Sequence, residues 1–260
     1  MIWRISLSPR ASFTVVNFGP RLLELHPNRG FFALLLTAVV VAACCAPAAA
    51  APARYYYLNP QQVELTVLLP PPPDLGSSEL RADEAQVASA VAARTPTELA
   101  DAQAASARSV FFFARSIGPG FTQARLPLTA RFFAHISSDV QRLIVEAKAY
   151  WQRPRPDGAN KKHGAYPSGH AAFAASTAIV LAQLIPAKRG AIFAQARIFA
   201  VNRILLGLHY PSDIASGWTA GTLAAFVMMH DRRFRHDFAA AEAELRAAHL
   251  VAMARAGQLQ

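Results

Sequence analysis

The chain has 260 residues, of which 53% are hydrophobic and 16% charged, and this balance excludes an intrinsically disordered protein. Its length supplies enough apolar material for one core of ordinary size. The only cysteines, Cys44 and Cys45, are neighbours, which excludes a disulfide-stapled miniprotein and a cysteine-based zinc module. The formal net charge of +10 fits a protein that meets polyanions or phosphorylated small molecules, although solubility alone explains most such surpluses.

Residues 1–50 have the pattern of an export signal. An irregular basic stretch leads to an apolar run at 31–43, which is too short for a comfortable membrane span. Small residues at 46–53 then offer A-x-A cleavage sites. We therefore expect the mature protein to be periplasmic or secreted. The tetrapeptide that ends at Cys44 also resembles a bacterial lipobox, so a lipid anchor on Cys44 is the alternative to ordinary cleavage.

Residues 51–77 are rich in proline. Three tyrosines at 55–57 precede four consecutive prolines at 70–73, and such a proline run forms neither a helix nor a central strand. We interpret 51–77 as an extended N-terminal arm on the surface of the domain, and 78–260 as the domain itself.

Helical signals follow the arm. Thr95 and Glu98 form a capping box with Pro96 at the first helical position, which predicts a helix that runs towards residue 113. The Gly-Pro-Gly sequence at 118–120 breaks the chain.

Pro127 opens a long amphipathic helix. Its apolar stripe passes through Phe132 and Ile144, and one turn later it reaches Lys148. A lysine in register with the core-facing stripe is unusual, because charged side chains normally occupy the opposite face. The alternative is that the helix has frayed by this point and Lys148 extends into solvent.

Three more helices and an amphipathic terminal helix are expected at about 169–185, 188–206, 212–231 and 232–260. The second of them places Arg203 on the same face as Phe199, where an apolar residue is expected. β-Branched alternation is almost absent, and the longest uncharged stretches, 171–187 and 214–229, are shorter than the roughly 20 residues of a membrane-spanning helix. The mature domain is therefore predicted to be all-α, with no integral membrane segment.

One of these helix starts, together with three cations from other segments, carries residues suited to binding an anion. Ser168 and Gly169 begin an apolar helix, whose unpaired backbone N–H groups and positive end attract negative charge. Lys148, Arg155 and Arg203 would neutralise an anion with several oxygens, and arginine does so with a fixed fork geometry.

Two histidines and one carboxylate accompany these cations. Pro211 fits the first turn of a helix, so His209 precedes that helix and Asp213 lies in its first turn, within hydrogen-bond reach of the imidazole. That contact would fix the tautomer of His209 and leave its other ring nitrogen available as a nucleophile. His170 is then the second group able to handle protons.

These segments resemble the phosphatidic-acid-phosphatase type 2 superfamily, and within it the bacterial class A non-specific acid phosphatases. The family pattern is K-x6-R-P, then P-S-G-H, then S-R-x5-H-x3-D, and the chain matches it from Lys148 to Asp213. The stretch at 65–73 also looks like the mature class A N-terminus. Asn202 departs from the pattern, because the family usually has Ser there. The loop with Lys161, Lys162 and His163 is at the short end for the family, and we interpret it as a solvated loop.

The resemblance implies a single-domain helical bundle and a metal-independent acid phosphatase of broad specificity that hydrolyses phosphomonoesters. It implies that His209 forms a phosphohistidine, that Asp213 orients it, and that His170 protonates the leaving group. No cofactor and no nucleic acid are implied, vanadate is expected to inhibit as a phosphate mimic, and family members are often homo-oligomers. The residues implied to hold the phosphate oxygens are Lys148, Arg155, Ser168, Gly169 and Arg203.

Three alternatives share these residues. A lipid phosphatase for phosphatidate or polyprenyl pyrophosphate has the same motifs but usually comes with several membrane helices. A vanadium-dependent haloperoxidase holds vanadate in the same cradle, although such chains are usually much longer. A non-catalytic phosphate- or polyanion-binding protein would explain the cations but would leave the two histidines and Asp213 without a role.

Overall fold

The computed structural model describes residues 55–158 and 163–251. All of them belong to the second of the two compact units into which the chain divides, residues 54–260. The predicted export signal, its cleavage sites and the lipid anchor at Cys44 lie outside the described residues, as do residues 161–162.

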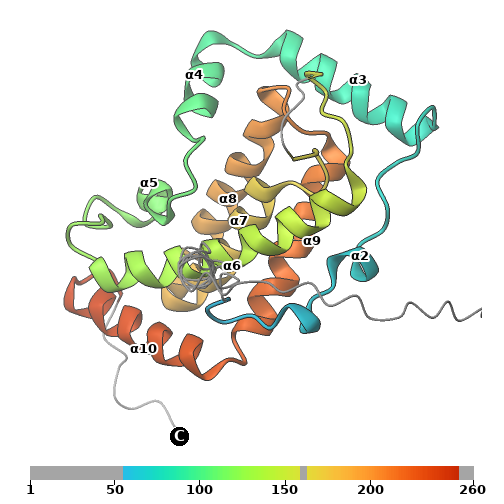
Figure 1. The fold of residues 1–260 in the computed structure, drawn as a ribbon. Helices are drawn as coiled ribbons and strands as arrows, with labels where there is room; N and C mark the ends of the chain where they lie inside the picture. The colour runs from blue at the N-terminus through green and yellow to red at the C-terminus, as the bar shows by residue number, and fades with distance from the viewer. Residues whose placement is uncertain (1–54, 159–162, 252–260) are drawn as a thin grey trace, which may run out of the picture. The chain divides into compact units, whose positions relative to one another are not determined.

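The described residues are helical and contain no β-strand, which confirms the all-α prediction (Figure 1). Short 3₁₀ turns are η1 (Pro60–Gln62), η2 (Val110–Phe113) and η3 (Pro186–Lys188). The α-helices are α2 (Leu65–Leu68), α3 (Ser78–Ala93), α4 (Pro96–Ala104), α5 (Ala114–Ile117), α6 (Pro127–Trp151), α7 (Gly169–Leu184), α8 (Arg189–Leu205), α9 (Pro211–Met228) and α10 (Arg232–Ala247).

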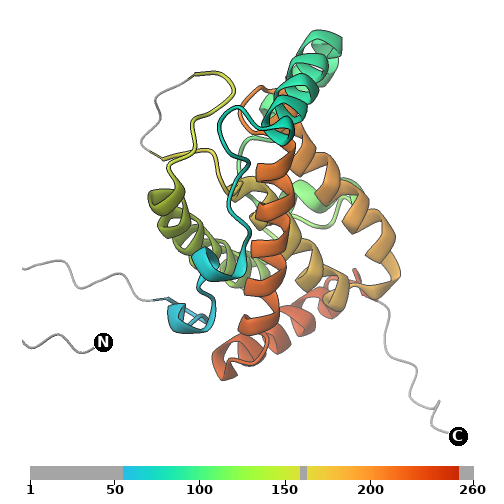
Figure 2. The same ribbon diagram turned by 90° about the vertical axis from the view of Figure 1, so that its right-hand side faces the viewer.

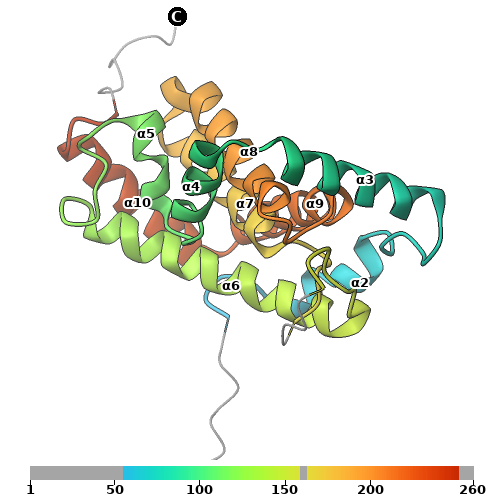
Figure 3. The same ribbon diagram turned by 90° about the horizontal axis from the view of Figure 1, so that it is seen from above.

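Helix α7 is the centre of the bundle. Its residues are mostly small or apolar and are buried around the whole circumference rather than along one stripe. It packs against α6 on one side and against α8 and α9 on the other (Figure 3). The start of α7, where Gly169 and His170 lie, is therefore surrounded by the helices that carry the other predicted site residues.

Two glycines of α9 allow this helix to approach α7 closely. A Cβ at Gly217 would lie 2.3 Å from the carbonyl oxygen of Ser168. At Gly221 the corresponding distance, to the carbonyl oxygen of Ala172, would be 2.1 Å. Only residues without a side chain fit at such contacts. The close approach joins the two helix starts, where the Ser168 N–H donates to the Asp213 carbonyl oxygen at 2.9 Å.

Helix α6 begins at Pro127, as predicted, and its apolar stripe is buried through Ile144. Lys148 continues that stripe and is only 5% exposed. Because α6 extends to Trp151, the alternative of a frayed helix end at Lys148 is wrong.

Helix α3 contacts α8 and α9 and lies at one end of α9 (Figure 2). Its buried Asp83 accepts hydrogen bonds from the backbone N–H of Ser212 at 3.1 Å and from the Ser212 hydroxyl. This contact ties α3 to the first turn of α9, close to the predicted His209–Asp213 pair.

The arm of residues 55–77 lies deeper than predicted and includes η1 and α2. Asp139 of α6 is fully buried and accepts hydrogen bonds from the backbone N–H groups of Tyr56, Tyr57 and Leu58, at 2.8, 2.7 and 3.1 Å respectively. Tyr57 and Leu58 are themselves buried in the core. An arm confined to the surface would have left this apolar area in water.

The helix predicted from Thr95 is shorter than expected. Its capping box with Glu98 is present, but α4 ends at Ala104, and Ser109 caps the separate turn η2. Residues 105–109 therefore leave the helix and run past the start of α7.

Helices α7, α8 and α9 lie within a few residues of their predicted bounds, and α10 is the predicted terminal helix up to Ala247. Residues 252–260 lie outside the described part of the chain. Among the helices of 55–158 and 163–251, none combines the length and apolar character that crossing a membrane requires.

Candidate active site

The predicted site residues come from four helix ends. Lys148 lies in the last turn of α6, Ser168 caps α7, Arg203 lies in the last turn of α8, and Asp213 lies in the first turn of α9. Arg155 follows α6 and reaches across to the segment before α9, where its Nη1 lies 3.2 Å from His209 Nε2. The structure thus brings together side chains that are far apart in the sequence.

His209 and Asp213 form the buried pair that their spacing predicts. His209 Nδ1 lies 3.2 Å from Asp213 Oδ2, and the two residues are 3% and 0% exposed. Asp213 Oδ2 also accepts the Tyr210 backbone N–H at 2.9 Å. Since a carboxylate accepts, His209 donates from Nδ1, and its Nε2 carries the lone pair that faces Arg155.

The charge state of His209 follows from burial. Burial, together with the nearby charges of Lys148 and Arg155, lowers its pKa to about 4, against the opposing effect of Asp213. The imidazole of the unliganded protein is therefore neutral at pH 7, which is the form that can act as a nucleophile.

Arg153 is a site residue that the motif did not identify. Its Nη1 donates to Asp213 Oδ1 at 2.6 Å, and its Nη2 donates to Asp83 Oδ2 at 2.9 Å. Its guanidinium also lies over the Tyr210 ring, 4.1 Å from the centroid. Burial raises the pKa of Asp213, but the hydrogen bond from His209 and the charges of His209 and Arg153 outweigh this effect and hold the pKa below its usual value.

Lys148 and Arg155 are held mainly by backbone carbonyls. Lys148 Nζ donates to the carbonyl oxygens of Gly164 and Ala165 at 2.5 and 2.8 Å. Arg155 Nη1 donates to the Leu208 carbonyl oxygen at 2.8 Å. Burial, reinforced by the charge of Arg155, lowers the pKa of Lys148 to about 7. An anion bound between these side chains would offset the mutual repulsion of their charges.

Two guanidinium N–H groups of the site lack partners. Among the described residues, Arg155 Nε and Arg203 Nε are buried and make no hydrogen bond. Arg203 Nη1 makes one long contact, to Ser106 Oγ at 3.4 Å, and burial lowers the pKa of Arg203 to about 10. Buried donors without an acceptor are costly, and an oxyanion would satisfy both.

His170 lies at the start of α7, where the 105–109 segment passes. Its Nε2 lies 3.0 Å from the Ser106 carbonyl oxygen, so this nitrogen carries the proton in the neutral ring. The ring stacks on Phe199 with the centroids 5.6 Å apart. Burial lowers the pKa of His170 to about 3, with a further contribution from Arg203, so the unliganded protein holds it neutral.

Ser168 caps α7 as predicted. Its Oγ accepts the Ala171 backbone N–H at 3.4 Å, and its own N–H is taken by the Asp213 carbonyl. The backbone N–H of Gly169 lies at the positive end of α7, where helix N–H groups have no carbonyl partner within the helix. Asn202, the departure from the family pattern, is buried in α8 next to Arg203.

Arg108 is a fourth cation that sequence reasoning did not identify. It belongs to the 105–109 segment, and its charge lowers the pKa values of Lys148, His170 and Arg203. Its Nη1 would lie 3.4 Å from a Cβ at Gly169. No motif or helical register marks Arg108 in the sequence, because the helix that precedes it ends four residues earlier.

Comparisons with known proteins identify a family and several relatives to which the sequence is similar. Residues 128–237 match the family model of the PAP2 superfamily, which is the phosphatidic-acid-phosphatase type 2 superfamily. The chain is 31% identical over 147 residues to an acid phosphatase of Zymomonas mobilis subsp. mobilis, a match that covers 51% of this chain and 55% of that protein. A non-specific acid phosphatase of Salmonella typhi is 32% identical over 71 residues, which are 27% of this chain and 28% of that protein.

The chain therefore spans about half the length of the first of these relatives and less of the second. Among solved structures, a transmembrane PAP2 type phosphatidylglycerolphosphate phosphatase from Bacillus subtilis aligns with 76% of this chain and 93% of its own, at 17% identity and a TM-score of 0.44. The matched range, residues 128–237, contains all eight predicted site residues, from Lys148 to Asp213. Over residues 128–237 this chain is similar to the PAP2 superfamily.

Proposed function

We propose that this protein is an acid phosphatase that hydrolyses phosphomonoesters through a phosphohistidine on His209. The observation that carries the proposal is the environment of His209 Nε2. It is the unprotonated nitrogen of a neutral imidazole whose other nitrogen is fixed by Asp213, and it faces a cluster of cations. The acid phosphatase relatives in Zymomonas and Salmonella support the same activity.

Substrate binding is proposed to use the phosphoryl group alone. Lys148 and Arg155 come from the end of α6 and the loop after it, Arg203 comes from the end of α8, and the unpaired Nε donors of the two arginines are available for the phosphate oxygens. The Gly169 N–H adds a backbone donor at the start of α7. Since these groups contact phosphate oxygens and not the alcohol, the proposal predicts broad specificity.

In the first chemical step, His209 Nε2 attacks phosphorus. The Nε2–P bond forms while the P–O bond to the alcohol breaks, and the alcohol oxygen keeps the bonding electron pair. The cations stabilise the charge that spreads over the equatorial oxygens, which is the main source of catalysis in phosphoryl transfer. Asp213 stabilises the positive charge that develops on the imidazole.

His170 is proposed to protonate the departing oxygen and then to deprotonate the water that releases phosphate. In the unliganded protein His170 is neutral, because burial and Arg203 hold its pKa at about 3. A bound phosphate dianion opposes both effects and raises this pKa. The proposal therefore predicts an acidic activity optimum; a rate that stays flat through pH 8 would contradict it.

Lys148, Arg155 and Arg203 are proposed to neutralise the phosphate without a metal ion. Among the described residues, no group of three or more His, Cys, Asp or Glu side chains is placed to hold one. Asp213 is already engaged by His209 and Arg153. Activity is therefore expected to survive EDTA.

A panel of phosphate esters tests the proposal. The full chain is expected to hydrolyse p-nitrophenyl phosphate, nucleoside monophosphates and sugar phosphates, with inhibition by vanadate and none by EDTA. The His209→Ala variant is the matched control and is expected to be inactive while folded by circular dichroism. Hydrolysis confined to phosphatidate in micelles would favour the lipid phosphatase, and halide oxidation with vanadate and peroxide would favour the haloperoxidase.

A further inference from the structure

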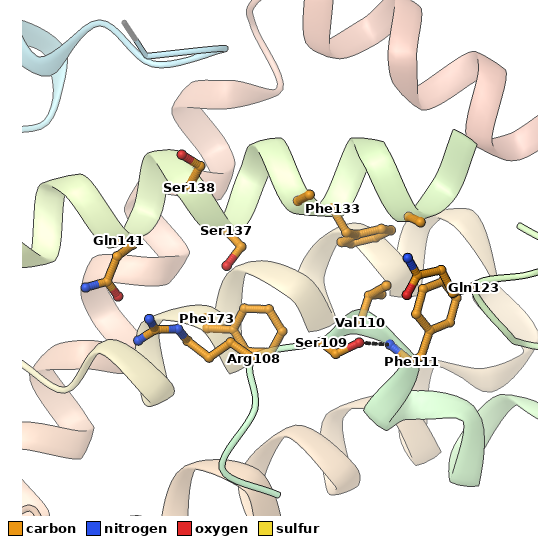
Figure 4. A pocket seen from close by; sticks show the side chains of 12 residues that line it. Arg108, Ser109, Val110, Phe111, Gln123, Phe133, Ser137, Ser138, Gln141 and Phe173 are labelled. Carbon is orange, nitrogen blue, oxygen red and sulfur yellow. Dashed lines mark hydrogen bonds between the residues drawn. The ribbon is translucent and has the colours of Figure 1, made fainter. Parts of the chain in front are cut away.

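A cavity of about 440 Å³ opens beside the predicted phosphate site (Figure 4). It lies between α6, the start of η2 and the second turn of α7. Aromatic side chains and polar side chains of α6 line it, and the residues used below are Arg108, Phe111, Phe133, Ser137, Gln141 and Phe173. Its volume is in the range of small-molecule binding sites.

The cavity begins where the phosphate site ends. A Cβ at Gly169 would lie 3.3 Å from Gln141 Oε1 and 3.4 Å from Arg108 Nη1, so both side chains border the residue that precedes His170. Figure 4 shows the ends of Arg108 and Gln141 close together at one end of the cavity, and Phe173 beside them. Phe173 follows His170 by one turn of α7 and also lines the cavity.

This position is on the His170 side of the site. Arg108 borders Gly169, the residue that precedes His170, and its charge lowers the pKa values of His170, Lys148 and Arg203. In the proposed mechanism His209 attacks from one face of the phosphate, and the leaving group departs on the opposite face, towards His170. Arg108 and the cavity therefore lie where the leaving group would be.

One polar atom here lacks a partner. Among the described residues, Gln141 Oε1 is buried without a hydrogen bond, and the exposed Arg108 lies on the same side of Gly169. The positive charges of Lys148, Arg155 and Arg203 already outnumber the two negative charges of a phosphomonoester, and Arg108 adds one more positive charge. A second anionic group next to the scissile phosphate would balance it.

We propose that Arg108 is a substrate-binding residue that recognises a second phosphoryl group on the leaving-group side, and that the cavity accepts the organic part of such a diphosphate between Phe133 and Phe173. The guanidinium fork matches two phosphate oxygens, and Ser137 and Gln141 offer hydrogen bonds to a polar ring or sugar. The inference rests on the proposed phosphatase activity and names a substrate class for it.

With a nucleoside diphosphate as substrate, the reaction follows the same two steps. His209 Nε2 attacks the terminal phosphorus, the Nε2–P bond forms and the bridging P–O bond breaks. The nucleoside monophosphate leaves with the bonding electron pair, and water then releases phosphate and restores His209. Because a phosphate leaves more readily than an alkoxide, this reaction depends less on protonation by His170.

The test compares ADP with AMP as probes. The Arg108→Ala variant is expected to lower kcat/KM for ADP about 10- to 100-fold more than for AMP, the range for losing a charge-assisted hydrogen bond. The Arg108→Lys variant keeps the charge but not the fork and is expected to lose an intermediate amount. Arg115→Ala is the matched control, since Arg115 is exposed and pairs with Asp101 at 3.8 Å, outside the site.

The outcomes separate the two proposals. Competitive inhibition by inorganic pyrophosphate and by phosphate gives a second readout. The Arg108→Ala variant is expected to weaken inhibition by pyrophosphate more than inhibition by phosphate. Equal losses for ADP and AMP, or none for either, would overturn the role of Arg108 while leaving the phosphatase intact. If the wild-type protein hydrolyses neither these nucleotides nor p-nitrophenyl phosphate, the proposed function itself fails.

Discussion

At the scale of single residues, the proposed role of His170 is the one that depends most on the leaving group. The His170→Ala variant is expected to lose about 10²- to 10⁴-fold in kcat/KM on sugar phosphates, because an alkoxide needs a proton to depart. On p-nitrophenyl phosphate the loss is expected to be much smaller, since p-nitrophenolate leaves without one. Steady-state rates on the two substrates measure the difference, and equal losses would argue against a general acid.

In the proposed mechanism Arg153 is a positioning residue, which acts on His209 through its contact with Asp213. The Arg153→Ala variant is expected to lower the free energy of unfolding by about 3–5 kcal/mol, because it leaves Asp83 and Asp213 as buried carboxylates without their cation. Urea denaturation measures this loss. The Arg153→Lys variant retains the charge and is expected to recover part of the stability.

A second readout distinguishes positioning from a purely structural role. Without Arg153, the charge of Asp213 acts more strongly on His209, and the pKa of His209 is expected to rise above about 4. An NMR titration of the folded variant measures this value. An unchanged pKa would show that Arg153 only stabilises the fold.

The residues of the site were predictable where their spacing is local. His209 and Asp213 lie one helical turn apart, so the sequence alone indicated their contact. Arg153 is 70 residues from Asp83 and 60 from Asp213, and no local pattern joins them. Arg108 was missed for another reason: it reaches the site only because α4 stops at Ala104, which tertiary packing decides and propensity does not.

At the scale of elements, the contact between α7 and α9 sets the distance from Ser168 to Asp213. The Gly221→Ala variant would place a Cβ 2.1 Å from the Ala172 carbonyl oxygen, so the helices must separate. We expect a loss of about 1–3 kcal/mol or more in the free energy of unfolding and a lower kcat, since the start of α9 carries His209 and Asp213. Urea denaturation and steady-state rates measure both.

Gly190 is the matched control. It lies in the first turn of α8, and a Cβ there would have no atom within 4 Å. Gly190→Ala is expected to leave activity unchanged and stability equal or slightly higher, because alanine favours the helix. If Gly221→Ala behaves like Gly190→Ala, the close helix contact does not position the site.

The helices themselves were predictable because strong local signals mark their ends. Pro127, the Thr95–Glu98 capping box and Pro211 each stand where a helix begins in the structure. The burial of the arm was not predictable from the sequence. The arm is anchored by the buried carboxylate of Asp139, which accepts three hydrogen bonds from the backbone of a segment more than 80 residues away. Such a contact leaves no periodic pattern in either segment.

At the scale of the whole molecule, the site makes stability depend on pH. Burial holds the pKa of His209 at about 4 and that of His170 at about 3, both below the value of 6.5 for an unperturbed histidine. At pH values between the native pKa values and 6.5, the unfolded chain binds more protons than the native protein. The free energy of unfolding therefore falls as the pH falls below about 6.5. Above that pH the contribution of the two histidines is constant.

Urea denaturation across this range, without phosphate, measures the effect. The His170→Gln variant is expected to show a shallower decline, because one of the two depressed pKa values is removed. Saturating phosphate is expected to reduce the decline as well, because a bound dianion raises both pKa values. A wild-type stability that is unchanged from pH 7 to pH 4 would contradict these protonation states.

The central claim is that His209 becomes covalently phosphorylated, and trapping that intermediate tests it most directly. The full chain is mixed with a ³²P-labelled phosphomonoester, quenched in alkali because phosphohistidine is labile in acid, and digested for mass spectrometry. We predict label on the peptide that contains His209 and none in the His209→Ala variant. Label on another residue, or label that persists in that variant, would contradict the account.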